Sequence, residues 1–162
     1  MGGPLAQNHL ESRRDVLSYT SPALEEPVDI AGPVRLCLWV DSTAPDTDFV
    51  GKLLDVRPDG RAIIIADGAL RVRHREGFDT EKPLHPREAA EIVVDLGHVC
   101  ARIATGHRIR VHISSSNFPH LDRNANSGAP VGTDETLSTA RQRVHHKGAR
   151  ASGLTLTVLS GD

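Results

Sequence analysis

Apolar and polar residues alternate with a period of two along several short stretches of the chain, and this is the period of a β-strand with one buried face. The clearest stretch is residues 108–114. It predicts that Ile109, Val111 and Ile113 face inward, and that the outward face carries Arg108, Arg110 and His112. Residues 34–40 repeat the pattern with four apolar side chains on one face: Val34, Leu36, Leu38 and Val40.

Turn signals separate further strand-like stretches. Pro58 and Gly60 in the sequence RPDG suit a tight type I turn. The other expected strands cover residues 49–56, 62–66, 69–73, 92–96, 99–103, 136–145 and 154–159. Because no amphipathic helix of useful length lies between them, we predict an all-β fold. At this size a jelly-roll β-sandwich is the natural candidate.

The chain reads as one domain preceded by a short arm. Residues 1–14 have no regular period and are interpreted as an N-terminal arm or linker remnant, and residues 15–162 as the domain. The 162 residues, 38% hydrophobic and 25% charged, have the profile of a soluble globular protein that needs no disulfides. Cys37 and Cys100 lie in apolar runs, so we expect two buried free thiols.

The charge balance argues against two classes of partner. A net charge of −2 at pH 7 provides no basic field for nucleic acid or for anionic lipid. No stretch approaches the roughly 18 apolar residues of a membrane helix, and the N-terminus has no signal-peptide pattern. We therefore expect a cytoplasmic protein that binds neither nucleic acid nor membranes.

Motifs for nucleophilic catalysis and for cofactors are missing from the sequence. The G-x-S-x-G pentapeptide that raises a serine out of an α/β-hydrolase sheet does not occur. Residues 114–116 are serines at the end of an expected strand, and we interpret them as satisfying loop backbone groups. Glycine-rich phosphate loops are also missing, so no cofactor is expected.

Metal ligands are not expected from the histidines or the loop acids. His107 and His112 fall on opposite faces of a strand, and the adjacent His145 and His146 diverge. Three loop acids offer oxygens for a calcium ion, but without the glycine and glutamate of a dedicated calcium loop: Asp41, Asp46 and Asp48. We interpret them as solvated loop acids and leave a structural calcium open. No metal-binding residue is assigned.

A carbohydrate- or ligand-binding β-sandwich is the alternative class of function. Such modules stack sugars on exposed aromatic rings, and this chain has five aromatic residues: Tyr19, Trp39, Phe49, Phe78 and Phe118. Trp39 and Phe49 lie in expected strands and are predicted to be core residues. The few remaining rings make this alternative the weaker one.

Several ordered motifs resemble one protein family. Residues 106–128 read GHRIRVHISSSNFPHLDRNANSG, residues 44–49 read APDTDF and residues 58–62 read PDGRA. Residues 71–73 form an R-x-R motif in the same order. In these segments the chain resembles the C-terminal non-catalytic domain of X-Pro dipeptidyl-peptidases and cocaine esterase-type serine hydrolases.

This resemblance implies a fold and a role. The family's domain is a galactose-binding-like jelly roll that packs on an α/β-hydrolase domain, and the catalytic Ser, Asp and His belong to the hydrolase domain. No catalytic residue is therefore carried over to this chain, and enzymatic activity of the chain by itself stays uncertain. We expect an accessory domain that packs on the catalytic domain and helps to shape its substrate pocket.

The long polar loop after residue 114 is the candidate structural or interface element. It has little apolar content, so side chains must satisfy its backbone groups. The residues singled out are Asn117, Phe118, Asp122, Arg123, Asn124 and Asn126. The loop is expected either to brace the sandwich, through a charge pair of Asp122 or Arg123, or to face the hydrolase domain. Leu5 and Leu10 in the arm are candidates for exposed apolar area that supports homo-oligomers.

Overall fold

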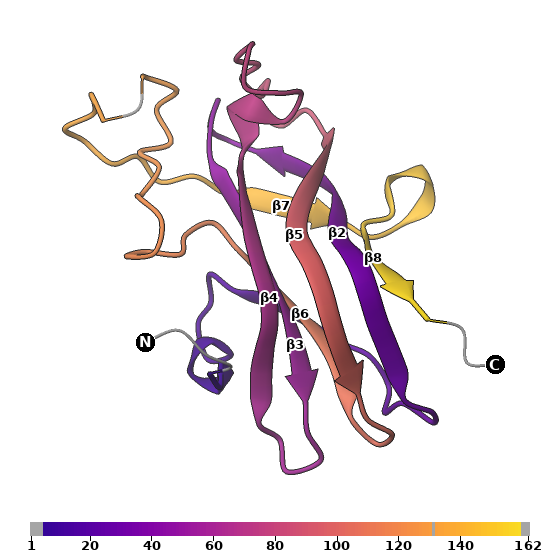
Figure 1. Cartoon of the computed structure of the whole chain (residues 1–162). Helices are drawn as coiled ribbons and strands as arrows, with labels where there is room; N and C mark the ends of the chain where they lie inside the picture. The colour runs from indigo at the N-terminus through magenta and orange to yellow at the C-terminus, as the bar shows by residue number, and fades with distance from the viewer. Residues whose placement is uncertain (1–4, 131, 160–162) are drawn as a thin grey trace.

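The computed structural model describes residues 5–130 and 132–159, and within these residues every regular element except three short 3-10 helices is a β-strand. The 3-10 helices are Asn8–Leu10, Val72–His74 and Gly148–Arg150. Two antiparallel sheets pack face to face, as Figure 1 shows. The predicted all-β sandwich is confirmed. No helix in the described part of the chain is both long enough and apolar enough to span a bilayer.

The first sheet has the strand order β1-β6-β3-β4. Its strands are β1 (Leu17–Thr20), β6 (Arg108–Ser114), β3 (Asp48–Val56) and β4 (Ala62–Arg71). The second sheet is built around the long strand β2 (Val28–Ser42), with β5 (Ala90–Ile103) on one edge. The other edge of β2 pairs with both β7 (Gln142–His145) and β8 (Gly153–Val158).

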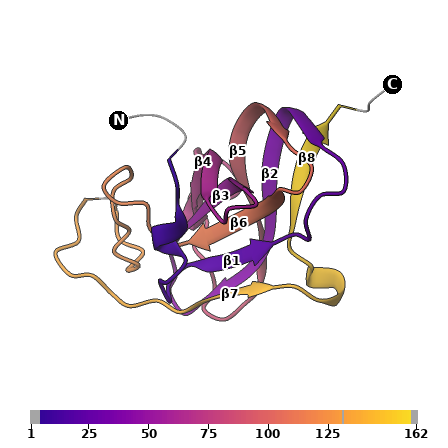
Figure 2. The same cartoon turned by 90° about the horizontal axis from the view of Figure 1, so that it is seen from below.

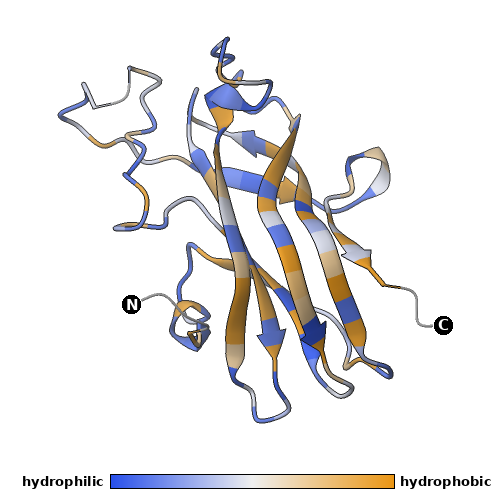
Figure 3. Cartoon of the chain, viewed as in Figure 1, coloured by the Kyte–Doolittle hydropathy of each residue, from blue (hydrophilic) through white to orange (hydrophobic). Residues whose placement is uncertain are grey.

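The core lies between the two sheets, where the inward residues predicted from alternation meet. All four predicted apolar residues of β2 are buried: Val34, Leu36, Leu38 and Val40. They pack in one cluster with Phe49 of β3 and with Val111 and Ile113 of β6. The orange and blue bands that alternate along the strands in Figure 3 follow this period of two.

One side of the sandwich is closed by the close approach of β4 and β5. A Cβ atom at Gly68 would lie 2.0 Å from the carbonyl oxygen of Asp95, so only glycine fits where these strands meet. On the other side β1 and β7 come near each other (Figure 2), and the Tyr19 hydroxyl lies 2.9 Å from Nε2 of His146. The two sides thus hold the sheets together in different ways.

The segment before β1 covers the outer face of the first sheet. Ala6 forms an isolated bridge with Ile63, and the amide of Gln7 donates to the carbonyl of Ala62 at 2.8 Å. Beneath this segment, Leu54 and Val56 belong to a small second cluster of buried apolar residues. The outer face of this sheet is therefore partly buried.

Several predicted boundaries differ from the structure. The expected strands 62–66 and 69–73 merge into one strand, β4, which ends at Arg71, so that Val72 and Arg73 fall in the 3-10 helix after it. The expected strands 92–96 and 99–103 are one strand, β5. Gly68 stays paired within β4, whereas the register of β5 with β2 shifts beside Gly97, between the pairs Pro33–His98 and Arg35–Asp95, and the strand continues past it. The expected strand 136–145 is regular only in β7, and β1 was not predicted at all.

Four side chains were assigned to the wrong environment. His112 was expected on the solvent side, but it is only 2% exposed because the N-terminal segment covers it. Trp39 was expected in the core, yet it lies half-buried on the outer face of β2, with the Arg150 guanidinium 5.8 Å from its ring centre. Cys37 is half-buried and Cys100 is exposed, because both lie on outward positions of their strands.

Candidate functional site

The candidate loop, residues 115–141, joins β6 to β7 at one end of the sandwich and extends beyond it (Figure 1). At the same end lie the turn between β2 and β3 together with the first residue of β3, which carry Asp46 and Asp48, and the segment that follows β4. These three segments are far apart in sequence. Hydrogen bonds and ion pairs between buried side chains connect them.

Asp46 and Arg73 form the buried centre of this network. Their side chains are 1% and 4% exposed, and Nε of Arg73 lies 2.8 Å from Oδ2 of Asp46. The backbone amide of Arg73 also donates to Asp46 Oδ1 at 3.1 Å. A second guanidinium nitrogen donates to the carbonyl of Ala129 at 2.8 Å, which ties the long loop to the strand end. A charged pair this deeply buried needs all of these bonds.

Asp48 forms a second, parallel pair. Arg71 donates two hydrogen bonds to its carboxylate, at 2.8 and 3.0 Å. This bidentate contact raises the pKa of the Arg71 guanidinium. The side-chain amide of Asn124 donates both to Asp46 Oδ2 at 3.0 Å and to Asp48 Oδ1 at 2.8 Å. One loop residue therefore bridges the two carboxylates.

The rest of the loop holds its shape around Asn124 and Asn126. The Asn124 side-chain oxygen accepts the amide of Asn126 at 2.8 Å, and the Asn126 side chain donates to the carbonyl of Ser138 at 2.7 Å. Asn126 has a φ of 61°, a left-handed conformation that asparagine tolerates better than most residues. Both asparagines act on the backbone of the loop, as expected for a loop with little apolar content.

The other candidate residues line the start of the loop. Asn117 donates from its side chain to Asp67 of β4 at 3.2 Å. Phe118 is 57% exposed, and the guanidinium carbon of Arg123 lies 4.4 Å from its ring centre. Asp122 is exposed, and no ion pair joins it or Arg123 to another described residue. The expected charge pair was thus assigned to the wrong residues, because Asn124 makes the bridge.

The three loop acids are not solvated, which corrects that interpretation. Asp46 and Asp48 are held by arginines, and Asp41 Oδ2 lies 2.9 Å from Nε2 of His145. Within residues 5–130 and 132–159, no three His, Cys, Asp or Glu side chains gather where they could hold a metal ion. His145 and His146 contact different partners, Asp41 and Tyr19, as their divergence on a strand predicts.

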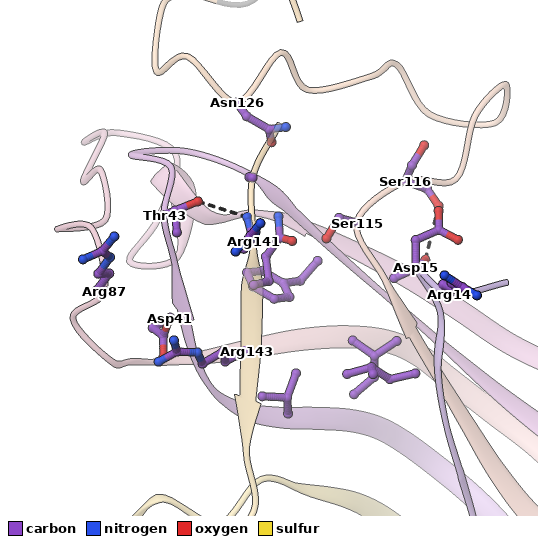
Figure 4. A pocket seen from close by; sticks show the side chains of 17 residues that line it. Arg14, Asp15, Asp41, Thr43, Arg87, Ser115, Ser116, Asn126, Arg141 and Arg143 are labelled. Atoms are coloured by element: carbon purple, nitrogen blue, oxygen red, sulfur yellow. Dashed lines mark hydrogen bonds and ion pairs between the residues drawn. The ribbon is translucent and has the colours of Figure 1, made fainter. Parts of the chain in front are cut away.

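A cleft of about 770 Å³ opens beside the loop, between the strand ends and the segment before β1. Figure 4 shows the arginines around it, which come from separate segments: Arg14, Arg87, Arg141 and Arg143. Among the described residues, the side chains of Arg87 and Arg141 have no carboxylate partner. Arg87 also has a φ of 68°. The cleft therefore presents unpaired positive charge near exposed loop residues.

Sequence reasoning missed the two arginines that organise the network. Arg71 and Arg73 lie at the end of β4 and just beyond it, where alternation alone says nothing about their partners. The signal that could have found them is the R-x-R spacing together with the APDTDF motif, which carries both acids. Each motif was recognised separately.

The structure defines the chain as an antiparallel β-sandwich with a braced polar loop at one end. The chain belongs to the family of X-Pro dipeptidyl-peptidase C-terminal non-catalytic domains, whose family model matches residues 4–155. The resemblance seen in the sequence motifs is confirmed.

Larger hydrolases contain a similar domain as their C-terminal part. The chain is 40% identical over 159 residues to a cocaine esterase from Rhodococcus sp. (strain MB1 Bresler), covering 97% of this chain and 28% of that protein. Among solved structures, an aminopeptidase from a marine sediment Thaumarchaeota archaeon has a TM-score of 0.91 and 31% identity, covering 97% of this chain and 28% of that one. An α-amino acid ester hydrolase has a TM-score of 0.91 and 30% identity, covering 96% of this chain and 27% of that one.

Proposed function

We propose that this domain packs on a catalytic α/β-hydrolase domain and helps to shape the substrate pocket of that domain. The observation that carries the proposal is the family itself, because the homologues are larger hydrolases with an N-terminal catalytic domain. The chain spans 28% of the length of the cocaine esterase and of the archaeal aminopeptidase. Its part is structural: it offers a shaped surface and performs no proton transfer.

The loop end of the sandwich is the face proposed to dock. Four large apolar side chains are exposed on the loop and on the segment after β4: Phe78, Phe118, Leu121 and Leu137. Exposed apolar side chains that gather at one end of a domain favour an interface. The unpaired arginines of the cleft add positive charge, which suits a docking surface with acidic side chains.

A braced loop suits this role because it enters the interface already ordered. The bond from Arg73 to the carbonyl of Ala129 and the bridge made by Asn124 fix the loop backbone. Ordering the loop before docking lowers the entropy lost on association. Bracing and docking, the two roles foreseen for the loop, therefore serve one function.

A chimera tests the proposal. This chain replaces the matching C-terminal part of the Rhodococcus cocaine esterase, and the chimera's esterase activity and melting temperature are measured. We expect Phe118→Asp and Leu137→Asp to lower both, since each places a carboxylate in the proposed interface. Val93→Asp is the control, because Val93 is 46% exposed on β5, away from the loop. Equal effects of all three variants would contradict the proposed docking face.

The chain by itself is expected to lack esterase activity. Incubation with a chromogenic ester or an X-Pro-anilide, with and without a serine-directed inhibitor, tests this. Inhibitor-sensitive turnover would place a reactive serine in this chain and refute the accessory role.

Three further expectations stay predictions. The division into an arm (1–14) and a domain (15–162) awaits limited proteolysis. Self-association was expected from Leu5 and Leu10; Leu5 is 56% exposed, whereas Leu10 is half-buried. Light scattering over a range of concentrations tests it. The alternative of a carbohydrate- or ligand-binding module is tested by a glycan array.

A further inference from the structure

His112 is buried without a hydrogen-bond partner. It is 2% exposed, and neither ring nitrogen bonds to any atom of the described residues. The β3–β6 register sets it opposite Lys52, on the outer face of the first sheet. Buried polar atoms in native proteins almost always have a hydrogen-bond partner, so a buried imidazole with two unpaired ring nitrogens needs an explanation.

A cavity of about 350 Å³ lies against this ring. One wall is the N-terminal segment, which contributes Leu10 and Val16, and another is the start of the loop, which contributes Phe118 and Arg123. The floor is the outer face of the sheet. A volume of this size is at the small end of the roughly 300–1,000 Å³ that ligand pockets usually have.

The lining is rich in hydrogen-bond donors and positive charge. It includes Arg13, Lys52 and Arg123, and no Asp or Glu. Arg13 is paired with the exposed Asp15. Lys52 donates only to the neutral side chain of Gln7, at 3.1 Å, and Arg123 stacks on Phe118. Two cationic groups therefore face the cavity without a carboxylate partner among the described residues.

The buried imidazole suits the same kind of ligand. Burial lowers the pKa of His112, so the ring is neutral near pH 7 and offers one donor and one acceptor. Glu11 opposes this effect, while Arg110 and Lys52 reinforce it. A ring N–H beside a cation can donate to an anionic oxygen that enters the cavity.

We propose that this cavity binds a small carboxylic acid, as its carboxylate, with a short apolar chain. The carboxylate accepts hydrogen bonds from His112 and from the cations Lys52 and Arg123. The apolar chain lies against Leu10, Val16 and Phe118. The floor of the site is the face of the first sheet that points away from the core, and the site shares Phe118 with the proposed docking face.

Calorimetry with matched probes tests the site. We titrate the protein with hexanoate, with its neutral analogue hexanamide, and with inorganic phosphate. We expect saturable one-site binding of hexanoate, and binding of hexanamide weaker by about tenfold or more, since charge-assisted hydrogen bonds are lost. Arg123→Gln should weaken hexanoate binding by a similar factor. Arg61→Gln, which changes an arginine outside the cavity, should leave it unchanged.

NMR of the histidine rings gives a second readout on the unmodified protein. The His112 resonances, assigned with His112→Gln, should move with the same saturation curve as the heat of hexanoate binding. If that variant does not fold, the ring spectra of wild type and Arg123→Gln are compared instead. Equal affinity for phosphate and hexanoate, or no saturable change with either, would overturn the proposal and leave a cavity that holds only water.

Discussion

Removing the guanidinium of Arg73 should destabilise the fold far more than removing an exposed one. Arg73→Met keeps the apolar stem but leaves the Asp46 carboxylate, which is 1% exposed, with only two donors. Breaking a buried ion pair by removing one partner costs about 3–5 kcal/mol. That is a large share of the roughly 5–15 kcal/mol that stabilises a typical domain.

Denaturant unfolding followed by circular dichroism measures this loss. Arg61→Met is the matched control, since Arg61 pairs with Asp59 at the same 2.8 Å, but both side chains are at least half exposed. We expect no measurable change for the control, because solvent screens an exposed pair. The slope against denaturant should stay the same in all variants.

A double-mutant cycle separates the ion pair from lost packing. Asp46→Leu and the double variant Arg73→Met/Asp46→Leu complete the cycle. Because removing both charges leaves no unpaired carboxylate, the double variant should lose less than the sum of the single losses, by about 1–3 kcal/mol. Strictly additive losses, or equal losses for Arg73→Met and Arg61→Met, would refute the reasoning.

Three other predictions follow from single contacts. Asn124→Ala should lower the melting temperature and Asp122→Ala should not, since only Asn124 bridges the two buried carboxylates. Gly68→Ala should cost about 3 kcal/mol, because its Cβ would meet the carbonyl of Asp95, whereas Gly153→Ala has open space; chemical denaturation compares them. Burial lowers the pKa of His112 below 6.5, so the unfolded chain takes up a proton first as the pH falls. The contribution of the neutral His112 ring to the free energy of unfolding should therefore be fully present above pH 6.5. It should be lost as the pH falls below 6.5, by at most about 1.4 kcal/mol per pH unit, and His112→Gln should remove this pH dependence.

The loop shows how much of a site can be predicted from sequence motifs. The sequence singled out Asn124 and Asp46 in two separate motifs, and both take part in the network. The sequence analysis assigned the bracing charge pair to Asp122 or Arg123, because charge was the only criterion that the sequence offers. A neutral amide with two donor hydrogens can bridge two carboxylates, but only the fold shows that they lie within 3.0 Å of it.

The residues that face inward on β2 and β6, and the all-β class, were readable from the sequence alone. Alternation is a local property of the strand, so Val34 to Val40 and Ile109 to Ile113 could be assigned without knowing their neighbours. The ordered motifs determined the family in the same local way.

Only the tertiary structure decided what covers the opposite faces. His112 alternates as an outward residue and is nevertheless buried, because a segment about a hundred positions earlier lies over it. Trp39 occupies an equivalent outward position and is only half-buried, with the Arg150 guanidinium over its ring. Burial of an outward side chain depends on packing against segments far away in the sequence, and the alternation of apolar and polar residues along one strand does not reveal that packing.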